Sequence, residues 1–146
     1  MKELRSRVGL VFQYPEHQLF ETEIFKDVCF GPKNLGLSQK EVEIRAFESL
    51  RLVGIDDNMF YQSPFDLSGG QKRRVAIAGV LAMKPDVLIL DEPTRNFSPL
   101  SGPVIRKMLR EFPGAVISIS HDRKYIEEVC DKIYQLNPNG LQLIGD

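Results

Sequence analysis

The residues from Asp86 to the end constrain the fold most strongly, because short apolar runs alternate there with helical patterns. Buried strands are predicted at residues 86–90 and 115–120, with another near the start at 7–12. Helices are predicted at about 101–111 and 123–130, followed by a hairpin around the turn residues 137–140. Such alternation is typical of an α/β domain with a largely parallel sheet.

Residues 21–84 have a helical pattern instead. Ser38 with Glu41, and Ser68 with Gln71, match the capping box that begins a helix. Gly54 is placed to end the helix that starts after Ser38, and Pro85 to stop the helix that starts after Ser68. The sequence therefore predicts an α-helical insertion in the α/β domain.

Composition excludes several classes of function. The net charge is -1 and 27% of the residues are charged, which gives no electrostatic footprint for nucleic acid or an anionic membrane. Cys29 and Cys130 lie far apart and outside any CxxC pattern, so we expect no metal site or disulfide and a reduced, cytosolic setting. The apolar run at 75–83 is about half the length that crosses a bilayer, so membrane association requires a protein partner.

Polar side chains follow each predicted strand of the sheet. Gln13 comes after the first strand, Asp91 and Glu92 after the second, and His121 after the third. Ligands of α/β sheets bind at the carboxyl ends of the strands. A carboxylate pair there suits Mg-nucleotide chemistry, in which one acid holds the metal and the other orients a water molecule. The alternative is that the two acids merely end a strand.

The segment SGGQ at 68–71 is a candidate anion site. Two glycines after a capping serine allow an anion to approach the backbone, and the helix that begins there directs free N–H groups and the positive end of its dipole forward. The alternative is an ordinary capped helix. The basic residues 72–74 that follow are better explained as a solvated helix face than as a nucleic-acid patch.

Taken together, these motifs resemble those of ATP-binding cassette (ABC) ATPases in order and spacing. The resemblance covers essentially the whole chain, and LSGGQ followed about twenty residues later by an apolar DEPT strand is highly specific for that family. Two segments further resemble the ATPase subunits of energy-coupling-factor importers for cobalt, nickel and vitamins. The motifs are LSGGQ at 67–71, DEPT at 91–94 and ISISHD at 117–122, and the two segments are VFQYPEHQLF at 11–20 and DVCFGPKNLGLS at 27–38.

The resemblance implies a partial P-loop NTPase fold of the ABC cassette type. In that family's terms, residues 1–20 would be the Q-loop strand and loop. Residues 21–84 would be the helical subdomain with the signature motif, and residues 85–146 would be the Walker B and switch part of the α/β core.

The resemblance also implies a role for each site residue, with ATP and Mg²⁺ as cofactors. Gln13 would be the Q-loop glutamine that senses the γ-phosphate and Mg²⁺, and Asp91 the acid that binds the metal. Glu92 would be the general base and His121 the switch histidine at the γ-phosphate. The signature residues, which would grip the nucleotide held by a second subunit, are Ser68, Gly69, Gly70 and Gln71.

The implied partners are a second ABC ATPase subunit, identical or different, and a transmembrane coupling subunit that docks in a groove near Gln13. We therefore expect a peripheral protein on the cytoplasmic face of the cell membrane, with no nucleic acid and no direct membrane insertion. Its function would be to couple ATP hydrolysis to uptake of a metal ion or vitamin. The solute is chosen by a separate membrane subunit in this class.

Two departures from the family pattern shape the expectations. The 146 residues contain no GxxxxGK[ST] loop, so we expect the C-terminal portion of a cassette that is inactive alone and associates through an uncovered apolar sheet face. Residues 95–99 read RNFSP where the family usually has AGLDP. Ser98 thus stands in place of the D-loop aspartate near the nucleotide, and its hydroxyl forms hydrogen bonds but carries no charge.

Two alternatives stay open beside the importer ATPase. The first alternative is a non-catalytic partner that completes the site of an intact ATPase. The second is a soluble ABC protein of translation, as the segment SHDRKYI at 120–126 suggests. Gln71 and the FGPKNLG segment at 30–36 argue against the translation protein.

Overall fold

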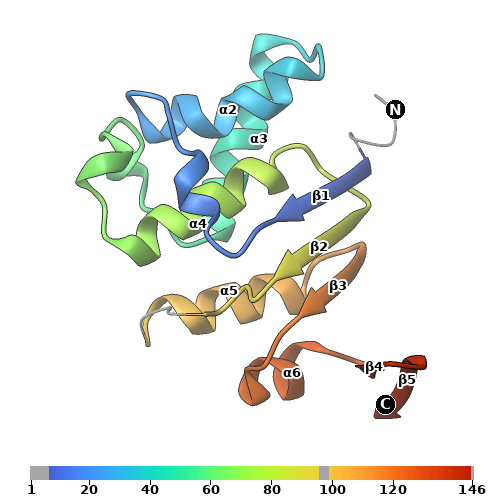
Figure 1. Cartoon of the computed structure of the whole chain (residues 1–146). Coiled ribbons are helices and arrows are strands. Elements are labelled where there is room, and N and C mark those ends of the chain that lie inside the picture. The colour runs from blue at the N-terminus through green and yellow to red at the C-terminus, as the bar shows by residue number, and fades with distance from the viewer. Residues whose placement is uncertain (1–6, 96–98, 146) are drawn as a thin grey trace.

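The computed structural model describes residues 7–95 and 99–145. Three parallel strands form a sheet with β2 in the centre, and a group of helices from the first half of the chain lies beside it (Figure 1). The strands are β1 (Val8–Val11), β2 (Val87–Asp91) and β3 (Ala115–Ile119). The prediction of an α/β fold with a parallel sheet is confirmed.

The register of the sheet aligns the three carboxyl ends. Val11 of β1 pairs with Leu90 of β2, and Asp91 of β2 pairs with Ile119 of β3. The residues that follow these three strands therefore lie at the same edge of the sheet.

The helical insertion lies between β1 and β2, as predicted. Its helices are α2 (Ile24–Asn34), α3 (Gln39–Leu52) and α4 (Gly69–Leu81), with short 3₁₀ turns η1 (Pro15–Gln18), η2 (Asp57–Met59) and η3 (Pro64–Asp66). Gly54 ends α3 as expected, with a left-handed φ of 75° that suits glycine.

Two details of the predicted helix ends are wrong. At the start of α3 the Ser38 hydroxyl accepts from the Glu41 backbone N–H, but the Glu41 carboxylate bonds Arg45 Nε at 3.1 Å, so only half of that capping box forms. The helix α4 ends at Leu81, before Pro85, because the chain turns through Lys84 with a φ of 50°.

The second half of the chain follows the predicted alternation. Helix α5 (Ser101–Arg110) connects β2 to β3, and α6 (Arg123–Val129) follows β3. Strands β4 (Ile133–Asn137) and β5 (Gly140–Gly145) form the predicted antiparallel hairpin, which is a separate two-stranded sheet. Among the described residues, no helix has the length and apolar character needed to cross a membrane.

One face of the three-stranded sheet is covered by helices. Val11, Leu88 and Leu90 are buried on this face and belong to one core with apolar residues of α4 and α5. Tyr125 of α6 is buried, and its hydroxyl forms a hydrogen bond with the Ser118 hydroxyl of β3, with the two oxygens 2.6 Å apart. Burial raises the pKa of Tyr125 to about 12, so this phenol stays neutral.

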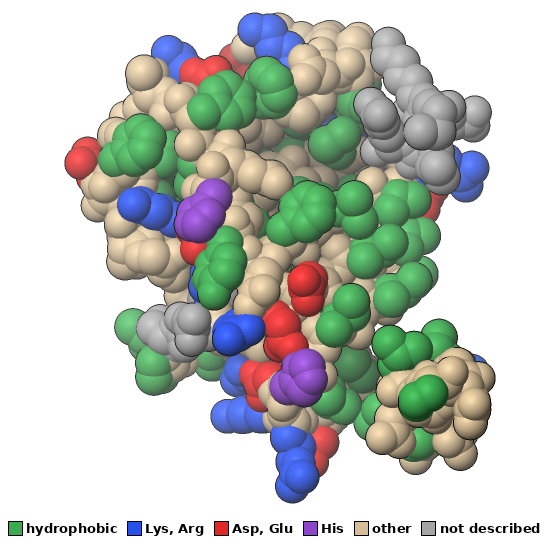
Figure 2. Space-filling model, viewed as in Figure 1, with side chains coloured by type: hydrophobic (Ala, Val, Ile, Leu, Met, Phe, Trp, Pro, Cys, Tyr) green, Lys and Arg blue, Asp and Glu red, His purple; other side chains and the backbone are tan. Residues whose placement is uncertain are grey.

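The opposite face of the sheet is apolar and open. Leu10, Ile89 and Ile117 occupy neighbouring strands in register, and Ile117 is 56% exposed. Hydrophobic side chains gather over the strands on the face shown in Figure 2. The predicted uncovered apolar face is confirmed, and self-association through it stays a prediction.

Replacing Ile117 with Lys should reduce self-association, because a charge is costly to bury between two apolar surfaces. Leu52→Lys on α3 is the matched control, since Leu52 is also 56% exposed but lies away from the sheet. Sedimentation velocity at tens of micromolar should show oligomers for the parent chain and Leu52→Lys, and mostly monomer for Ile117→Lys. A monomeric parent chain would contradict this expectation.

Candidate functional site

The loops after β2 and β3 bring Glu92 next to His121. The Glu92 backbone N–H donates to the Ile119 carbonyl at 2.7 Å, which continues the pairing of the two strands by one residue. Glu92 has a left-handed φ of 48°, a conformation that is costly for a residue other than glycine and clusters at functional sites. This turn directs the Glu92 side chain toward the loop of β3.

Both carboxylate oxygens of Glu92 contact His121. The Oε1 atom lies 2.5 Å from the imidazole Nδ1, and Oε2 accepts from the His121 backbone N–H at 3.3 Å. The Glu92 side chain is 14% exposed, whereas that of His121 is 91% exposed. When Nδ1 donates to the carboxylate, the Nε2 edge of the ring remains available to solvent or a ligand. The structure thus brings two predicted site residues together.

A side-chain hydrogen bond between Thr94 and Asp122, called here the Thr94 tie, also joins these two loops. Thr94 Oγ1 donates to Asp122 Oδ2 at 2.7 Å, and Asp122 Oδ1 accepts from the Tyr125 backbone N–H at the start of α6. The Thr94 hydrogen bond is the main reason that the pKa of Asp122 lies below its ordinary value. These two residues were not predicted as site residues. Their signal in the sequence was their place at the ends of the DEPT and ISISHD motifs.

Asp91 and Gln13 lie at the same edge of the sheet. Asp91 ends β2 on the open face, because it alternates with Val87 and Ile89, and Gln13 leaves β1 two residues after Val11, the partner of Leu90. Both side chains are half-buried. Within residues 7–95 and 99–145 no three His, Cys, Asp or Glu side chains form a metal-binding group. Mg²⁺ in nucleotide sites needs only one or two carboxylates beside water and phosphate, and Asp91 fits that requirement.

The SGGQ turn is a complete and accessible helix start. Ser68 Oγ accepts from the Gln71 N–H at 3.2 Å, and Gln71 Oε1 accepts from the Ser68 N–H at 2.9 Å, which confirms the predicted capping box. Ser68 and Gly69 are exposed, and a Cβ on Gly69 would meet no atom within 4 Å. The first amides of an α-helix have no partner within the helix, so this turn fits an anion such as phosphate.

The SGGQ turn does not join the Glu92 and His121 pair. In Figure 1, α4 begins well apart from the arrowheads of β2 and β3. The two groups therefore belong to different places on the surface of one chain.

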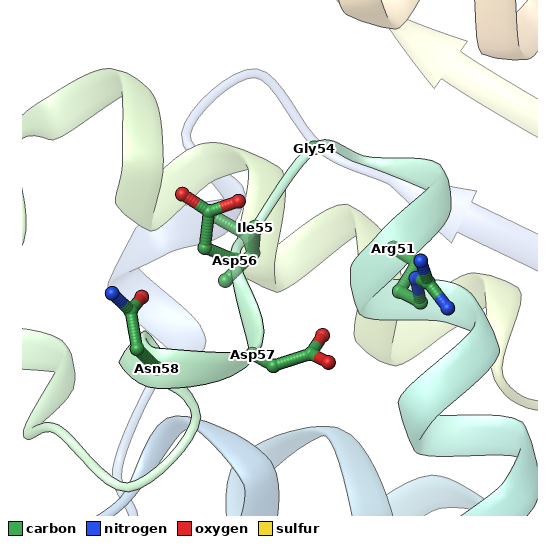
Figure 3. A pocket seen from close by; sticks show the side chains of 6 residues that line it. All are labelled: Arg51, Gly54, Ile55, Asp56, Asp57 and Asn58. Atoms are coloured by element: carbon green, nitrogen blue, oxygen red, sulfur yellow. The ribbon is translucent and has the colours of Figure 1, made fainter.

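Ser98 lies outside the described residues, so its predicted place near the nucleotide stays a prediction. A hollow in the helical insertion is lined by Arg51 and residues 54–58, with the carboxylates of Asp56 and Asp57 at its rim (Figure 3). None of the predicted site residues lines this hollow.

Comparison with known proteins identifies the family. The family model described as ABC transporter matches residues 1–95 of the 146. The chain belongs to the ABC transporter family. The resemblance inferred from the motifs is therefore confirmed.

Relatives within the ABC family carry the name energy-coupling factor transporter ATP-binding protein EcfA2. The protein of Caldanaerobacter subterraneus subsp. tengcongensis is 50% identical over 149 residues, which cover 99% of this chain and 52% of the relative. That of Clostridium acetobutylicum is 48% identical over 151 residues, covering 100% of this chain and 53% of the relative. The chain spans about half the length of these relatives.

Solved ABC structures share the fold. The cbiO1 protein of Clostridium perfringens, part of the ABC transporter complex cbiONQ, is 38% identical with a TM-score of 0.85, over 99% of this chain and 59% of that one. The dimeric ATP-binding cassette MJ0796, bound to ADP and Pi, is 28% identical with a TM-score of 0.77, over 91% and 60%. These likenesses confirm the predicted ABC cassette fold.

Asp122 should make folding stability depend on pH in the acid range. Its pKa is lower in the folded chain than the ordinary 3.8, so its contribution is present above pH 3.8 and is lost as pH falls through the folded value. Asp122→Asn keeps an N-cap acceptor but cannot titrate. Urea unfolding between about pH 2 and 4 should give a shallower pH dependence for this variant. Equal slopes would contradict the assignment.

Proposed function

We propose that this chain is the signature and switch portion of an ATP-hydrolysing subunit of an energy-coupling-factor importer, which drives uptake of a metal ion or vitamin. The contact between Glu92 and His121 at the carboxyl edge of the sheet is the observation that carries the proposal. The names of the EcfA2 relatives support the importer class.

Glu92 acts as the general base that accepts the proton of the attacking water. His121 bonds both oxygens of this carboxylate, through its ring and its backbone, and so fixes the direction in which the free lone pairs of Glu92 point. The exposed Nε2 edge of His121 is placed to contact the γ-phosphate. Catalysis of phosphoryl transfer depends on such positioning together with electrostatic stabilisation of the phosphate charge.

Asp91 would hold Mg²⁺ at the end of β2, and Gln13 would sense the metal and the γ-phosphate from the end of β1. Mg²⁺ supplies neutralisation of the phosphate charge. The half-buried positions of both side chains at one sheet edge support these roles.

The phosphate that the SGGQ turn grips belongs to a nucleotide held by a second polypeptide. The separation of the turn from β2 and β3 in Figure 1 and the accessibility of Ser68 and Gly69 support this proposal. Triphosphate is normally cradled by a GxxxxGK[ST] loop, and the 146 residues contain none. Alone, the chain therefore offers half of a site and hydrolyses ATP negligibly.

The partners are a second ABC ATPase subunit and a transmembrane coupling subunit that docks beside η1. The rings of Phe20 and Phe30 pack edge to face near η1, with their centroids 5.0 Å apart. Both side chains are about half exposed, so they could contact an apolar helix of a partner. The protein would thus be held at the cytoplasmic face of the membrane by its partners.

A non-catalytic half-site partner is the second candidate function. It is favoured by the completeness of the SGGQ capping box, which needs no contribution from Glu92 or His121. The two functions differ in whether Glu92 matters. In a complex of this chain with an intact ABC ATPase subunit, Glu92→Gln should lower ATP turnover if Glu92 is catalytic, whereas turnover with a half-site partner would be unaffected.

Gly69→Ala should weaken Mg-ATP-dependent association of this chain with an intact EcfA2-type subunit, because the new methyl group obstructs the approach of phosphate to the helix start. Gly79→Ala is the matched control. It lies in the same helix, and its Cβ likewise meets no atom within 4 Å. Sedimentation with and without Mg-ATP measures the association. Equal association of both variants would contradict the proposal.

A further inference from the structure

We infer that Thr94 and Asp122 form a positioning pair that holds the His121 imidazole against Glu92. The inference deepens the proposed function and rests on it for its catalytic meaning. The contacts themselves are independent of any nucleotide.

The loops after β2 and β3 are joined at three successive points. The first is the backbone hydrogen bond from Glu92 to Ile119, and the second is the contact of the Glu92 carboxylate with His121. The third is the hydrogen bond from Thr94 to Asp122 at 2.7 Å. The contact between Glu92 and His121 therefore lies between two other hydrogen bonds, the backbone bond from Glu92 to Ile119 before it and the Thr94 tie after it.

The tie at Thr94 is better protected from water than the contact it supports. Thr94 is 8% exposed, so if Asp122 moved, the Thr94 hydroxyl would be left buried without a hydrogen-bond partner, which is costly. The His121 side chain is almost fully exposed, and a contact at such a site is screened by solvent and opposed by side-chain entropy. The position of His121 thus depends on the backbone beside it more than on its own contact.

Asp122 is the residue that fixes this backbone. Its Oδ1 accepts from Tyr125 N–H, its own N–H donates to Ser120 Oγ at 3.1 Å, and its Oδ2 accepts from Thr94. Tyr125 is fully buried and anchors α6 against β3. With two hydrogen bonds to its carboxylate and one from its backbone N–H, Asp122 leaves His121, its chain neighbour, little freedom to turn away from Glu92.

Histidine labelled with ¹⁵N gives a direct test, because the chain has two histidines and the second serves as an internal reference. His17 stacks on Tyr14 with ring centroids 5.6 Å apart and takes no part in the contact. Glu92→Ala gives the Nδ1 resonance of a His121 that has lost its carboxylate.

Thr94→Val removes the hydroxyl and keeps the shape of the side chain. We expect the His121 Nδ1 resonance to move toward the Glu92→Ala position, with the ratio of contacting to free imidazole falling roughly fivefold, as loss of one hydrogen bond implies. Thr94→Ser keeps the hydroxyl and should leave His121 unchanged. His17 should be unchanged throughout.

An unmoved His121 resonance in a folded Thr94→Val chain would overturn the inference. Thr94→Ala carries the same expectation without a second methyl group in the core. If both variants unfold, Thr94 serves the fold and the inference fails. Because the readout needs no ATP, this failure is distinct from that of the proposed function, which nucleotide-dependent association tests.

Discussion

The parallel pairing of β2 with β3 is the constraint on which the rest of the site depends. It places Asp91 opposite Ile119, so the next residues of both strands meet at one edge of the sheet. The chain then accepts an unfavourable left-handed conformation at Glu92, whose cost must be offset by the contacts that fix it. The backbone bond to Ile119 and the two contacts with His121 are such contacts.

Much of this arrangement is predictable from the sequence, because the strands are short apolar runs and the register of a parallel sheet fixes where they end. Gln13, Asp91, Glu92 and His121 were placed at one edge on that basis. The capping box at Ser68 was equally readable, since it depends on residues three apart. The half-formed box at Ser38 was not, because Glu41 has a competing partner in Arg45 one turn further along α3.

The hydrogen bond between Thr94 and Asp122 was missed because the two residues lie 28 apart, at the ends of two separate motifs, and neither motif predicts a contact with the other. The fold alone brings them together. The family resemblance already implied that SGGQ serves a nucleotide other than the one at the strand edge, and in the structure the two lie apart. That separation is what makes a site shared between two polypeptides the natural interpretation of an ABC family member of this kind.

The central claim is that the helix start at Ser68 grips a triphosphate presented by another polypeptide. Isothermal titration of Mg-ATP into the purified chain tests it most directly, first alone and then with an intact EcfA2-type subunit present. We expect no saturable binding at micromolar concentrations for the chain alone, and tighter binding to the intact subunit in the presence of this chain than to the intact subunit by itself. Micromolar binding to the chain alone would contradict the claim.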